Sequence, residues 1–387
     1  MMDNVYVVSA KRTAVGKAGR GTFVQTRPDD LAAAASKGAV DAACIAPEKI
    51  DDVVIGCATP EAEQGMNVAR IDAREAGLPY TVPGMTINRF CSSGVQSIAI
   101  AAQAILAGSI DIAVAGGTES MTMIPMGGNK VSANPELMAR YPEAYTGMGA
   151  TAEIVATKFE VSREEQDRFA AESHRRMEAA QDAGRLSAGI IEVTTTVIGP
   201  EGSHEVTLNH DTINRRGTTY EGLAKLRPAF KPTGSVTAGN ASPLTDGAAA
   251  VVVMSEEKAK ELGITPIGYF HDIQIAGVDP DIMGTGPVPA IRMLLEKHNM
   301  KIEDIDLIEL NEAFAAQSVY CVRELGLDAA KVNPNGGAIA LGHPLGVSGT
   351  RMAGTLLNEL NRRGGKWGIV SMCIGGGMGA AALFEAA

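Results

Sequence analysis

Short β-branched runs alternate with alanine-rich stretches along most of this chain, and this alternation limits how it can fold. The runs VYVVSA, DDVVIG and DIAVAGG are separated by LAAAASKGAVDAA, NVARIDAREAG and SIAIAAQAIL. Strands that alternate with helices in this way predict α/β units around a largely parallel sheet. We therefore predict an α/β fold in which helices cover the faces of a sheet.

The 387 residues exceed the usual size of one compact core, so two or three domains are expected. Near residue 119 the alternation gives way to methionine, glycine and charged residues, and it returns near residue 244. A second strand-helix series begins near residue 267 and contains a weak echo of the first. The changes predict an N-terminal half at 1–118 plus 244–266, an inserted segment at 119–243 and a C-terminal half at 267–387.

Composition excludes several classes of function. A net charge of −11 argues against nucleic acid as a partner, because phosphate binding needs a basic surface. The apolar runs are shorter than the roughly 20 residues of a membrane span, so no span is expected. The chain starts in a strand pattern without a secretory signal and ends without a peroxisomal SKL-type tripeptide, so a cytoplasmic location is expected.

The five cysteines are scattered, without the spacing of a disulfide framework or a zinc site. Cys91 differs from the others because it lies where TINRF meets SSG and a long apolar helix begins. The start of a helix favours a thiolate, so Cys91 is a candidate nucleophile. A small cysteine buried in the core is the alternative.

Three further residues lie in contexts that suit chemistry. His343 lies in the glycine-dense loop GGAIALGHPLGVSG, and Pro344 restricts the backbone of this histidine. Cys373 begins CIGGGMG at the end of a buried strand, where open α/β sheets place ligands. Asn311 follows another apolar strand in LIELNEAFAAQ, and its alternative role is that of a helix N-cap.

Taken together, NRFCSSG, NEAFAAQ, GGAIALGHPLG and CIGGGMGAA resemble the motifs of the thiolase family, in that order and over essentially the whole chain. The phrases GGTESM, LAKLRPAF and TAGNASPLTDGAAA agree with the same family. The resemblance implies the thiolase fold, in which duplicated α/β halves form a five-layered α-β-α-β-α arrangement with an inserted loop domain for coenzyme A.

The resemblance also implies roles for the site residues. Cys91 corresponds to the acylated nucleophile, His343 to its base and Cys373 to the second acid-base thiol. Asn311 corresponds to the residue that holds a water near the thioester oxygen, and the backbone N–H groups of Cys91 and Gly375 to the oxyanion donors. No metal and no permanently bound cofactor are implied, because coenzyme A is a cosubstrate.

A basic stretch, NRRGTTYEGLAKLRPAFK, reverses the overall charge within the inserted segment. On composition it is equally a solvated basic face or a phosphate-binding surface. By motif position, Arg215 corresponds to the arginine that flanks the adenine of coenzyme A, and Ser242 to the serine near its pantetheine.

Two departures from the family pattern bear on the activity. Many relatives have a cysteine where this chain has Val347, so no third thiol is expected beside the histidine. Short-chain biosynthetic members usually have His-Met-Gly where this chain has Gly147-Met148-Gly149. This second departure, together with TTYEGLAKL and NEAFAAQSVYCV, favours the degradative 3-ketoacyl-CoA thiolases of fatty-acid β-oxidation, which cleave 3-ketoacyl-CoA with coenzyme A.

The main alternative is a biosynthetic acetyl-CoA acetyltransferase, which would use the same residues in reverse. A ketoacyl-carrier-protein synthase would carry histidines in the region of Cys373. A non-catalytic acyl-CoA-binding homologue would lack at least one of the four side chains. Family members are dimers or tetramers, so we expect a homodimer or homotetramer, with a hydratase-dehydrogenase subunit as a further partner in a β-oxidation complex.

Overall fold

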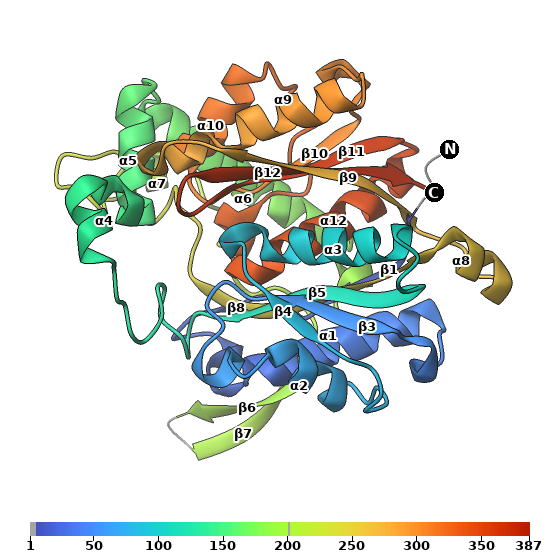
Figure 1. The fold of residues 1–387 in the computed structure, drawn as a ribbon. Helices are drawn as coiled ribbons and strands as arrows, with labels where there is room; N and C mark the ends of the chain where they lie inside the picture. The colour runs from blue at the N-terminus through green and yellow to red at the C-terminus, as the bar shows by residue number, and fades with distance from the viewer. Residues whose placement is uncertain (1–4, 200–201) are drawn as a thin grey trace.

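The computed structural model describes residues 5–199 and 202–387, and one continuous sheet runs through it (Figure 1). The sheet has two parts, which meet where Val5–Val7 pair with Gly268–Phe270. The first part consists of β1 (Val5–Arg12), β3 (Asp52–Gly56), β4 (Met85–Ile87), β5 (Ile112–Ser120) and β8 (Thr245–Ser255), with β2 (Gly16–Lys17) paired to β8. The second part consists of β9 (Gly268–Gly277), β10 (Leu307–Leu310), β11 (Trp367–Ile374) and β12 (Met378–Ala386).

The two parts have the same strand order. The first runs β4-β3-β5-β8-β1 and the second runs β10-β11-β12-β9, with a parallel bridge from Ile308 to Val332 in the place of β4. Corresponding neighbours also share their directions: β3–β5 and β10–β11 are parallel, while β5–β8 and β11–β12 are antiparallel. This agreement confirms the duplicated α/β halves expected from the sequence.

The prediction of a largely parallel sheet was wrong. Among the described strands, only the pairs β3–β4, β3–β5 and β10–β11 are parallel. The reason lies in the connections, because a parallel neighbour requires a crossover unit. The chain instead leaves β5 through the long inserted segment before it returns as β8, and a tight turn at 375–377 joins β11 directly to β12.

Helices lie on both outer faces of the sheet and between its two parts, which gives the five layers visible in Figure 1. One outer layer holds α1 (Pro28–Ala43) and α2 (Val68–Glu75), the central layer α3 (Ser93–Leu106) and α12 (Leu345–Arg363), and the other outer layer α9 (Pro287–Lys297) and α10 (Ala315–Glu324). Three apolar cores fill the spaces between the layers: one lies under each outer helix layer, and a single central core packs α3 and α12 against both parts of the sheet. Leu31, Ile98 and Ile291 are fully buried members of these cores.

The two central helices approach each other closely through glycine. A Cβ added at Gly94 of α3 would lie 2.6 Å from the carbonyl oxygen of Gly346 in α12, and one added at Gly117 of β5 would lie 1.9 Å from the same atom. Real Cβ atoms do not come this close to backbone, so these positions require glycine. The contact fixes the start of α3 against the start of α12, which are the two regions that carry Cys91 and His343.

The segment between β5 and β8 contributes its own elements: α4 (Pro135–Arg140), α5 (Met148–Lys158), α6 (Arg163–Asp182), β6 (Val193–Gly199), β7 (Gly202–Leu208) and α7 (Tyr220–Leu223). α6 begins with a capping box between Ser162 and Glu165, as its charged sequence suggests. A buried ion pair of 2.7 Å between Arg12 and Asp211 ties this segment to β1. The remaining helices are α8 (Glu256–Leu262) and α11 (Ala338–Leu341).

Short 3₁₀ turns connect several elements, at Thr22–Gln25, Pro47–Lys49, Ala62–Gln64, Phe90–Ser92, Pro142–Tyr145, Ser187–Gly189, Pro280–Thr285 and Ile302–Asp304. Among the described residues, no helix combines the length and the apolar character needed to cross a bilayer.

Candidate active site

Cys91 lies in the 3₁₀ turn that leads directly into α3, and its side chain is buried. The preceding residue, Phe90, has a φ of 43°, in the left-handed region that only glycine adopts easily. Its backbone N–H donates to Oδ1 of Asn88 at 2.8 Å, which holds the turn in this conformation. The sequence expectation of a cysteine at a helix start is therefore confirmed, and the backbone there is strained.

The end of β11 brings a second thiol and a backbone donor to Cys91. Cys373 is fully buried, and Gly375 begins the glycine turn that follows. The backbone N–H groups of Gly375 and of Cys91 itself favour a thiolate at Cys91. Burial, and then the proximity of Cys91, raise the pKa of the Cys373 thiol well above its usual value. The two thiols therefore lie in one dry site with backbone donors beside Cys91.

His343 lies between two side chains that fix its tautomer. Ser348 donates its hydroxyl proton to the carbonyl oxygen of Pro344 at 3.1 Å, so its oxygen accepts from Nδ1–H of His343 at 2.6 Å. Nδ2 of Asn311 then donates to Nε2 of His343 at 3.2 Å. The arrangement leaves Nε2 as an unprotonated nitrogen, which is the form that a general base requires.

Asn311 is not a helix N-cap, because α10 begins four residues later, at Ala315. Its side chain is 1% exposed, and its Oδ1 has no partner among the described residues. The backbone N–H of Asn311 donates to the carbonyl oxygen of Ser371 at 2.8 Å, two residues before Cys373. The turn that holds Cys91 packs against α12, which begins directly after His343 and Pro344, so the thiols and the Asn311–His343 pair face one region.

The resting state of this site is neutral. Burial raises the pKa of Cys91 to about 11, although the N–H groups of Gly375 and Cys91 oppose the shift. Burial, and then the positive charge of Arg351, lower the pKa of His343 to about 3. At neutral pH the Cys91 side chain is therefore a thiol and the His343 side chain a neutral imidazole.

Alkylation of Cys91 by iodoacetamide is expected to accelerate about tenfold for each pH unit from about pH 6 to about pH 9. The reason is the raised pKa, because the reactive thiolate fraction grows in proportion to hydroxide as long as the pH stays below it. Mass spectrometry of the Cys91 peptide measures the rate at each pH. A rate that is already constant at pH 6 would reveal a thiolate-imidazolium pair and contradict this description.

Glu119, near the end of β5, joins the parts of the chain that carry the candidate residues. Its buried carboxylate accepts the N–H groups of Ala58 and Gly346, each at 2.8 Å, and Nε2 of Gln64 at 2.6 Å. Gly346 lies in the first turn of α12, three residues after His343. The carboxylate therefore fixes the histidine loop of one half onto the sheet of the other.

Replacing Glu119 by Gln is expected to reduce the free energy of unfolding by about 3 kcal/mol, because the new NH₂ group faces buried donors and leaves them unpaired. Thermal unfolding of the variant measures the loss. The same substitution at Glu296, which is exposed on α9, provides the matched control and is expected to stay within about 0.5 kcal/mol of the wild type. Equal stability of the two variants would show that the Glu119 contacts contribute little.

The two residues assigned to coenzyme A lie in different surroundings. Ser242 is half-buried, and its hydroxyl donates to the carbonyl oxygen of Ala313 at 3.0 Å. Ala313 belongs to an apolar cluster that also contains Cys373, with Met148 packed against it. Arg215 is exposed on the surface of the inserted segment. The structure thus places Ser242 close to the candidate site and leaves Arg215 on the surface.

Sequence reasoning missed the residues that hold the candidate site in place. Ser348 lies in GHPLGVSG and Glu119 lies in GGTESM, two stretches that were compared with the family, but neither residue was assigned a role. A glutamate at the end of a strand that begins with an apolar run was an available signal, because acidic residues are seldom buried without partners. Among the described residues, no group of His, Cys, Asp and Glu side chains has the arrangement of a metal site.

Comparison with known proteins assigns this arrangement to a family. The model described as "Thiolase, N-terminal domain" matches residues 5–257, and the one described as "Thiolase, C-terminal domain" matches residues 264–386. The chain belongs to the thiolase family, which confirms the resemblance seen in its motifs.

Several similar proteins within the thiolase family are named 3-ketoacyl-CoA thiolase. The chain is 50% identical over 389 residues to the 3-ketoacyl-CoA thiolase of Bacillus subtilis, covering 99% of this chain and all of that protein. It is 47% identical to the peroxisomal 3-ketoacyl-CoA thiolase A of Mus musculus, covering 99% of this chain and 91% of that protein. The crystal structure of human mitochondrial 3-ketoacyl-CoA thiolase is 40% identical with a TM-score of 0.91, and covers both chains completely.

Proposed function

We propose that this chain cleaves 3-ketoacyl-CoA with free coenzyme A, releasing acetyl-CoA and a shortened acyl-CoA, as a step of fatty-acid β-oxidation. The observation that carries the proposal is the pair of neighbouring buried thiols beside the Gly375 N–H. An unprotonated imidazole nitrogen lies on the loop before α12, the helix that packs against the Cys91 turn. Relatives that are 45–50% identical over nearly the whole chain are named 3-ketoacyl-CoA thiolase, which supports the same activity.

In the first half-reaction, Cys91 attacks the C3 keto carbon while Nε2 of His343 loses its hydrogen bond from Asn311 and takes the Cys91 proton. The bond between C2 and C3 then breaks, leaving the acyl group on Cys91 and the enolate of acetyl-CoA. The imidazolium and a water held by the free Oδ1 of Asn311 stabilise the enolate oxygen. The Cys373 thiol donates its proton to C2, which completes acetyl-CoA and leaves a thiolate at Cys373.

In the second half-reaction, the Cys373 thiolate takes the proton of a new coenzyme A thiol, and the resulting CoA thiolate attacks the acyl-Cys91 thioester. The N–H groups of Cys91 and Gly375 stabilise the tetrahedral oxyanion, and each such donor is typically worth about 3 kcal/mol. Cys91 leaves as a thiolate and recovers its proton from His343. Both thiols and the imidazole thus return to their neutral resting state.

Coenzyme A binding falls to the inserted segment at 119–243 in this proposal, between an N-terminal half at 1–118 plus 244–266 and a C-terminal half at 267–387. Arg215 contacts the adenine portion and Ser242 lies along the pantetheine. Support comes from the position of Ser242 beside Ala313, whose neighbours in the apolar cluster include Cys373. The exposed guanidinium of Arg215 leaves its donors open to a ligand.

The test is the loss of the magnesium-enolate absorbance of a 3-ketoacyl-CoA on addition of coenzyme A. Acetoacetyl-CoA and a medium-chain 3-ketoacyl-CoA are compared with purified full-length protein. Faster turnover of the longer substrate supports the degradative activity. Turnover restricted to acetoacetyl-CoA would instead assign a biosynthetic acetyl-CoA acetyltransferase, and no turnover of either would leave a binding homologue.

The acetyltransferase is kept as the second candidate because of one specific likeness. The crystal structure of the Bacillus anthracis acetyl-CoA acetyltransferase is 41% identical to this chain, with a TM-score of 0.91 and coverage of 100% and 99% of the two chains. The same residues would serve that reaction in reverse, so the substrate comparison above separates the two activities.

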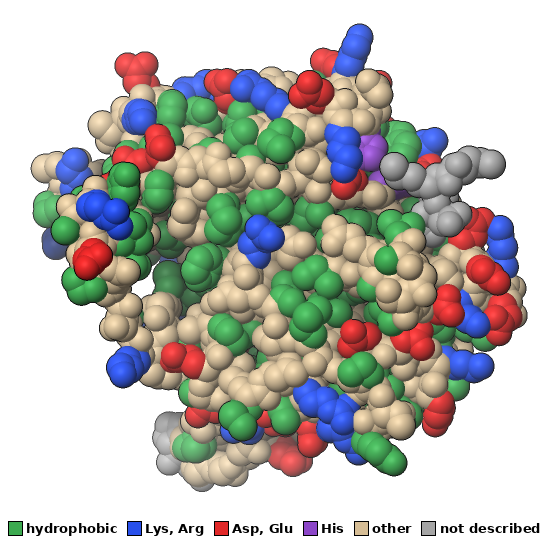
Figure 2. Space-filling view, in the orientation of Figure 1, with side chains coloured by type: hydrophobic (Ala, Val, Ile, Leu, Met, Phe, Trp, Pro, Cys, Tyr) green, Lys and Arg blue, Asp and Glu red, His purple; other side chains and the backbone are tan. Residues whose placement is uncertain are grey.

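We further propose that the protein is a cytoplasmic homodimer or homotetramer that joins a hydratase-dehydrogenase subunit in a β-oxidation complex. β4 is the edge strand of the first half, and large apolar side chains are exposed around it, including Met66 at 91% and Tyr80 at 75%. Figure 2 shows hydrophobic side chains over the middle of the face where β4 and α3 lie. An edge strand with such neighbours is normally covered by another protein surface, which favours contact with a second copy of the chain. Light scattering of the purified protein measures the number of subunits.

A further inference from the structure

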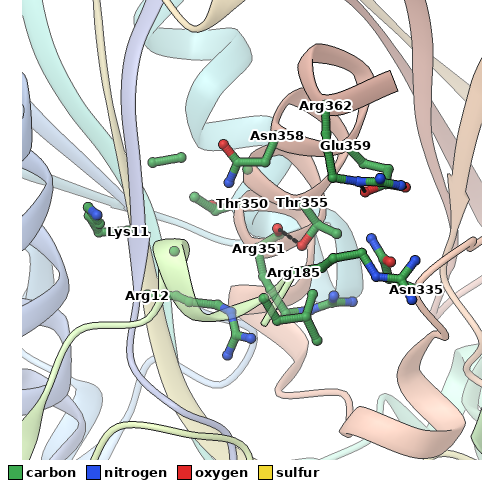
Figure 3. Close-up of a pocket in the computed structure, with 14 residues that line it drawn as sticks. Lys11, Arg12, Arg185, Asn335, Thr350, Arg351, Thr355, Asn358, Glu359 and Arg362 are labelled. Atoms are coloured by element: carbon green, nitrogen blue, oxygen red, sulfur yellow. Dashed lines mark hydrogen bonds and ion pairs between the residues drawn. The ribbon is translucent and has the colours of Figure 1, made fainter. Parts of the chain in front are cut away.

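A small cavity of about 40 Å³ lies along α12, beyond the candidate active site (Figure 3). It is bounded by α12, by β1 and by the turn at 185–189 that follows α6. Its lining is unusually basic, with charged side chains from all three elements: Lys11, Arg12, Arg185, Arg351, Glu359 and Arg362.

Most of these charges already have a partner inside the protein. The Lys11 ammonium donates to a backbone carbonyl oxygen at 2.7 Å, and Arg12 forms a bidentate pair with Asp211. Arg362 forms an ion pair of 2.6 Å with Glu359. These contacts leave two basic side chains to account for.

Arg185 and Arg351 are those two. Within residues 5–199 and 202–387, neither guanidinium has a hydrogen-bond or ion-pair partner, and the Nε atom of each is buried without one. Arg351 is only 4% exposed, yet a guanidinium keeps its proton in proteins. A buried cation without a direct partner is costly, and the cavity beside it gives space for such a partner.

The carboxylates near Arg351 compensate its charge only without direct contact. Glu309 and Glu312 favour the charged guanidinium, but Glu312 is occupied by Ser173, Asn333 and the N–H of Ile339. Burial raises the pKa of Glu309, and the charge of Arg351 opposes this shift. Among the described residues, no carboxylate therefore forms an ion pair with the Arg351 guanidinium.

We propose that this cavity binds one small inorganic anion, held by the guanidinium groups of Arg185 and Arg351 with the amide of Asn358 as an additional donor. The hydroxyls of Thr350 and Thr355 also line the cavity, but they donate to backbone carbonyl oxygens. A cavity of this size has room for about three waters, and hence for an anion between chloride and phosphate in size.

The bound anion connects two parts of the molecule. Arg185 belongs to the inserted segment, and Arg351 lies in the second turn of the helix that begins two residues after His343. An anion between them fastens the inserted segment onto the helix of the candidate base. Its effect is therefore on stability, and the site is separate from the two thiols.

The test is thermal unfolding of the full chain in increasing sodium phosphate and, separately, sodium chloride. Sodium gluconate, whose anion is too large for the cavity, keeps the ionic strength constant. The unfolding midpoint is expected to rise and to level off as the site fills, because the ligand binds only the folded chain. The anion that saturates at the lower concentration is the better fit to the cavity.

Arg185→Gln is the decisive variant, because this half-buried residue on a turn can be replaced without opening the core. The variant is expected to raise the half-saturating anion concentration at least about tenfold, because one charge-assisted contact to the anion is lost. Arg215→Gln removes an exposed arginine of the same segment outside the cavity and is expected to respond like the wild type. Loss of the anion response in Arg215→Gln would overturn the proposal and place the anion at the proposed coenzyme A site. The proposal would also be wrong if the unfolding midpoint of the wild type rose without levelling off, or if Arg185→Gln had the half-saturating concentration of the wild type.

Discussion

Replacing Cys91 by Ala is expected to lower kcat for thiolysis by at least about 10⁴-fold, because the acyl group then has no covalent carrier. The absorbance assay measures the loss, and mass spectrometry of the wild type mixed with 3-ketoacyl-CoA alone is expected to show the acyl group on the Cys91 peptide. Cys44→Ser, at the exposed end of α1, provides the control and is expected to keep full activity. Appreciable turnover by a folded Cys91→Ala variant would rule out the acyl-cysteine route.

Replacing His343 by Ala is expected to lower kcat by about 10³-fold to 10⁴-fold, the range of a general base that also stabilises charge. Cys91 has a raised pKa and cannot ionise alone at neutral pH, so acylation itself is expected to slow. Rapid-quench measurement of acyl-Cys91 separates this step from release.

Ser348→Ala provides a graded comparison with the His343 variant. Ser348 touches only Nδ1 of the imidazole, so it positions the ring and is expected to cost about 10-fold to 100-fold in kcat, with KM little changed. If Ser348→Ala and His343→Ala lost activity equally, the tautomer set by this serine would matter as much as the base itself.

Motifs located the candidate residues well because each motif is local in the chain. Cys91 at a helix start and Cys373 at a strand end are both properties of a short segment, and both are found as expected. Their neighbours depend on tertiary contacts that no segment contains. Glu119 lies 227 residues before the Gly346 N–H that it accepts, so spacing gave no indication of the pair.

Local signals also misjudged the directions of the strands and overlooked a buried arginine. Sheet direction was misjudged because the alternation of strands and helices does not reveal which strands become neighbours, and β8 pairs antiparallel with β5 after the inserted segment. Arg351 was passed over because its burial follows from the layer in which α12 lies.

The matching strand order of the two halves has a consequence for how many sites one chain holds. α3 and α12 are counterparts in the two halves, and Cys91 and His343 stand at their corresponding beginnings. A chain built as two related copies has the internal symmetry for a pair of identical sites. In the proposed mechanism one copy provides the nucleophile and the other the base, so two equivalent positions of the fold make up a single asymmetric site.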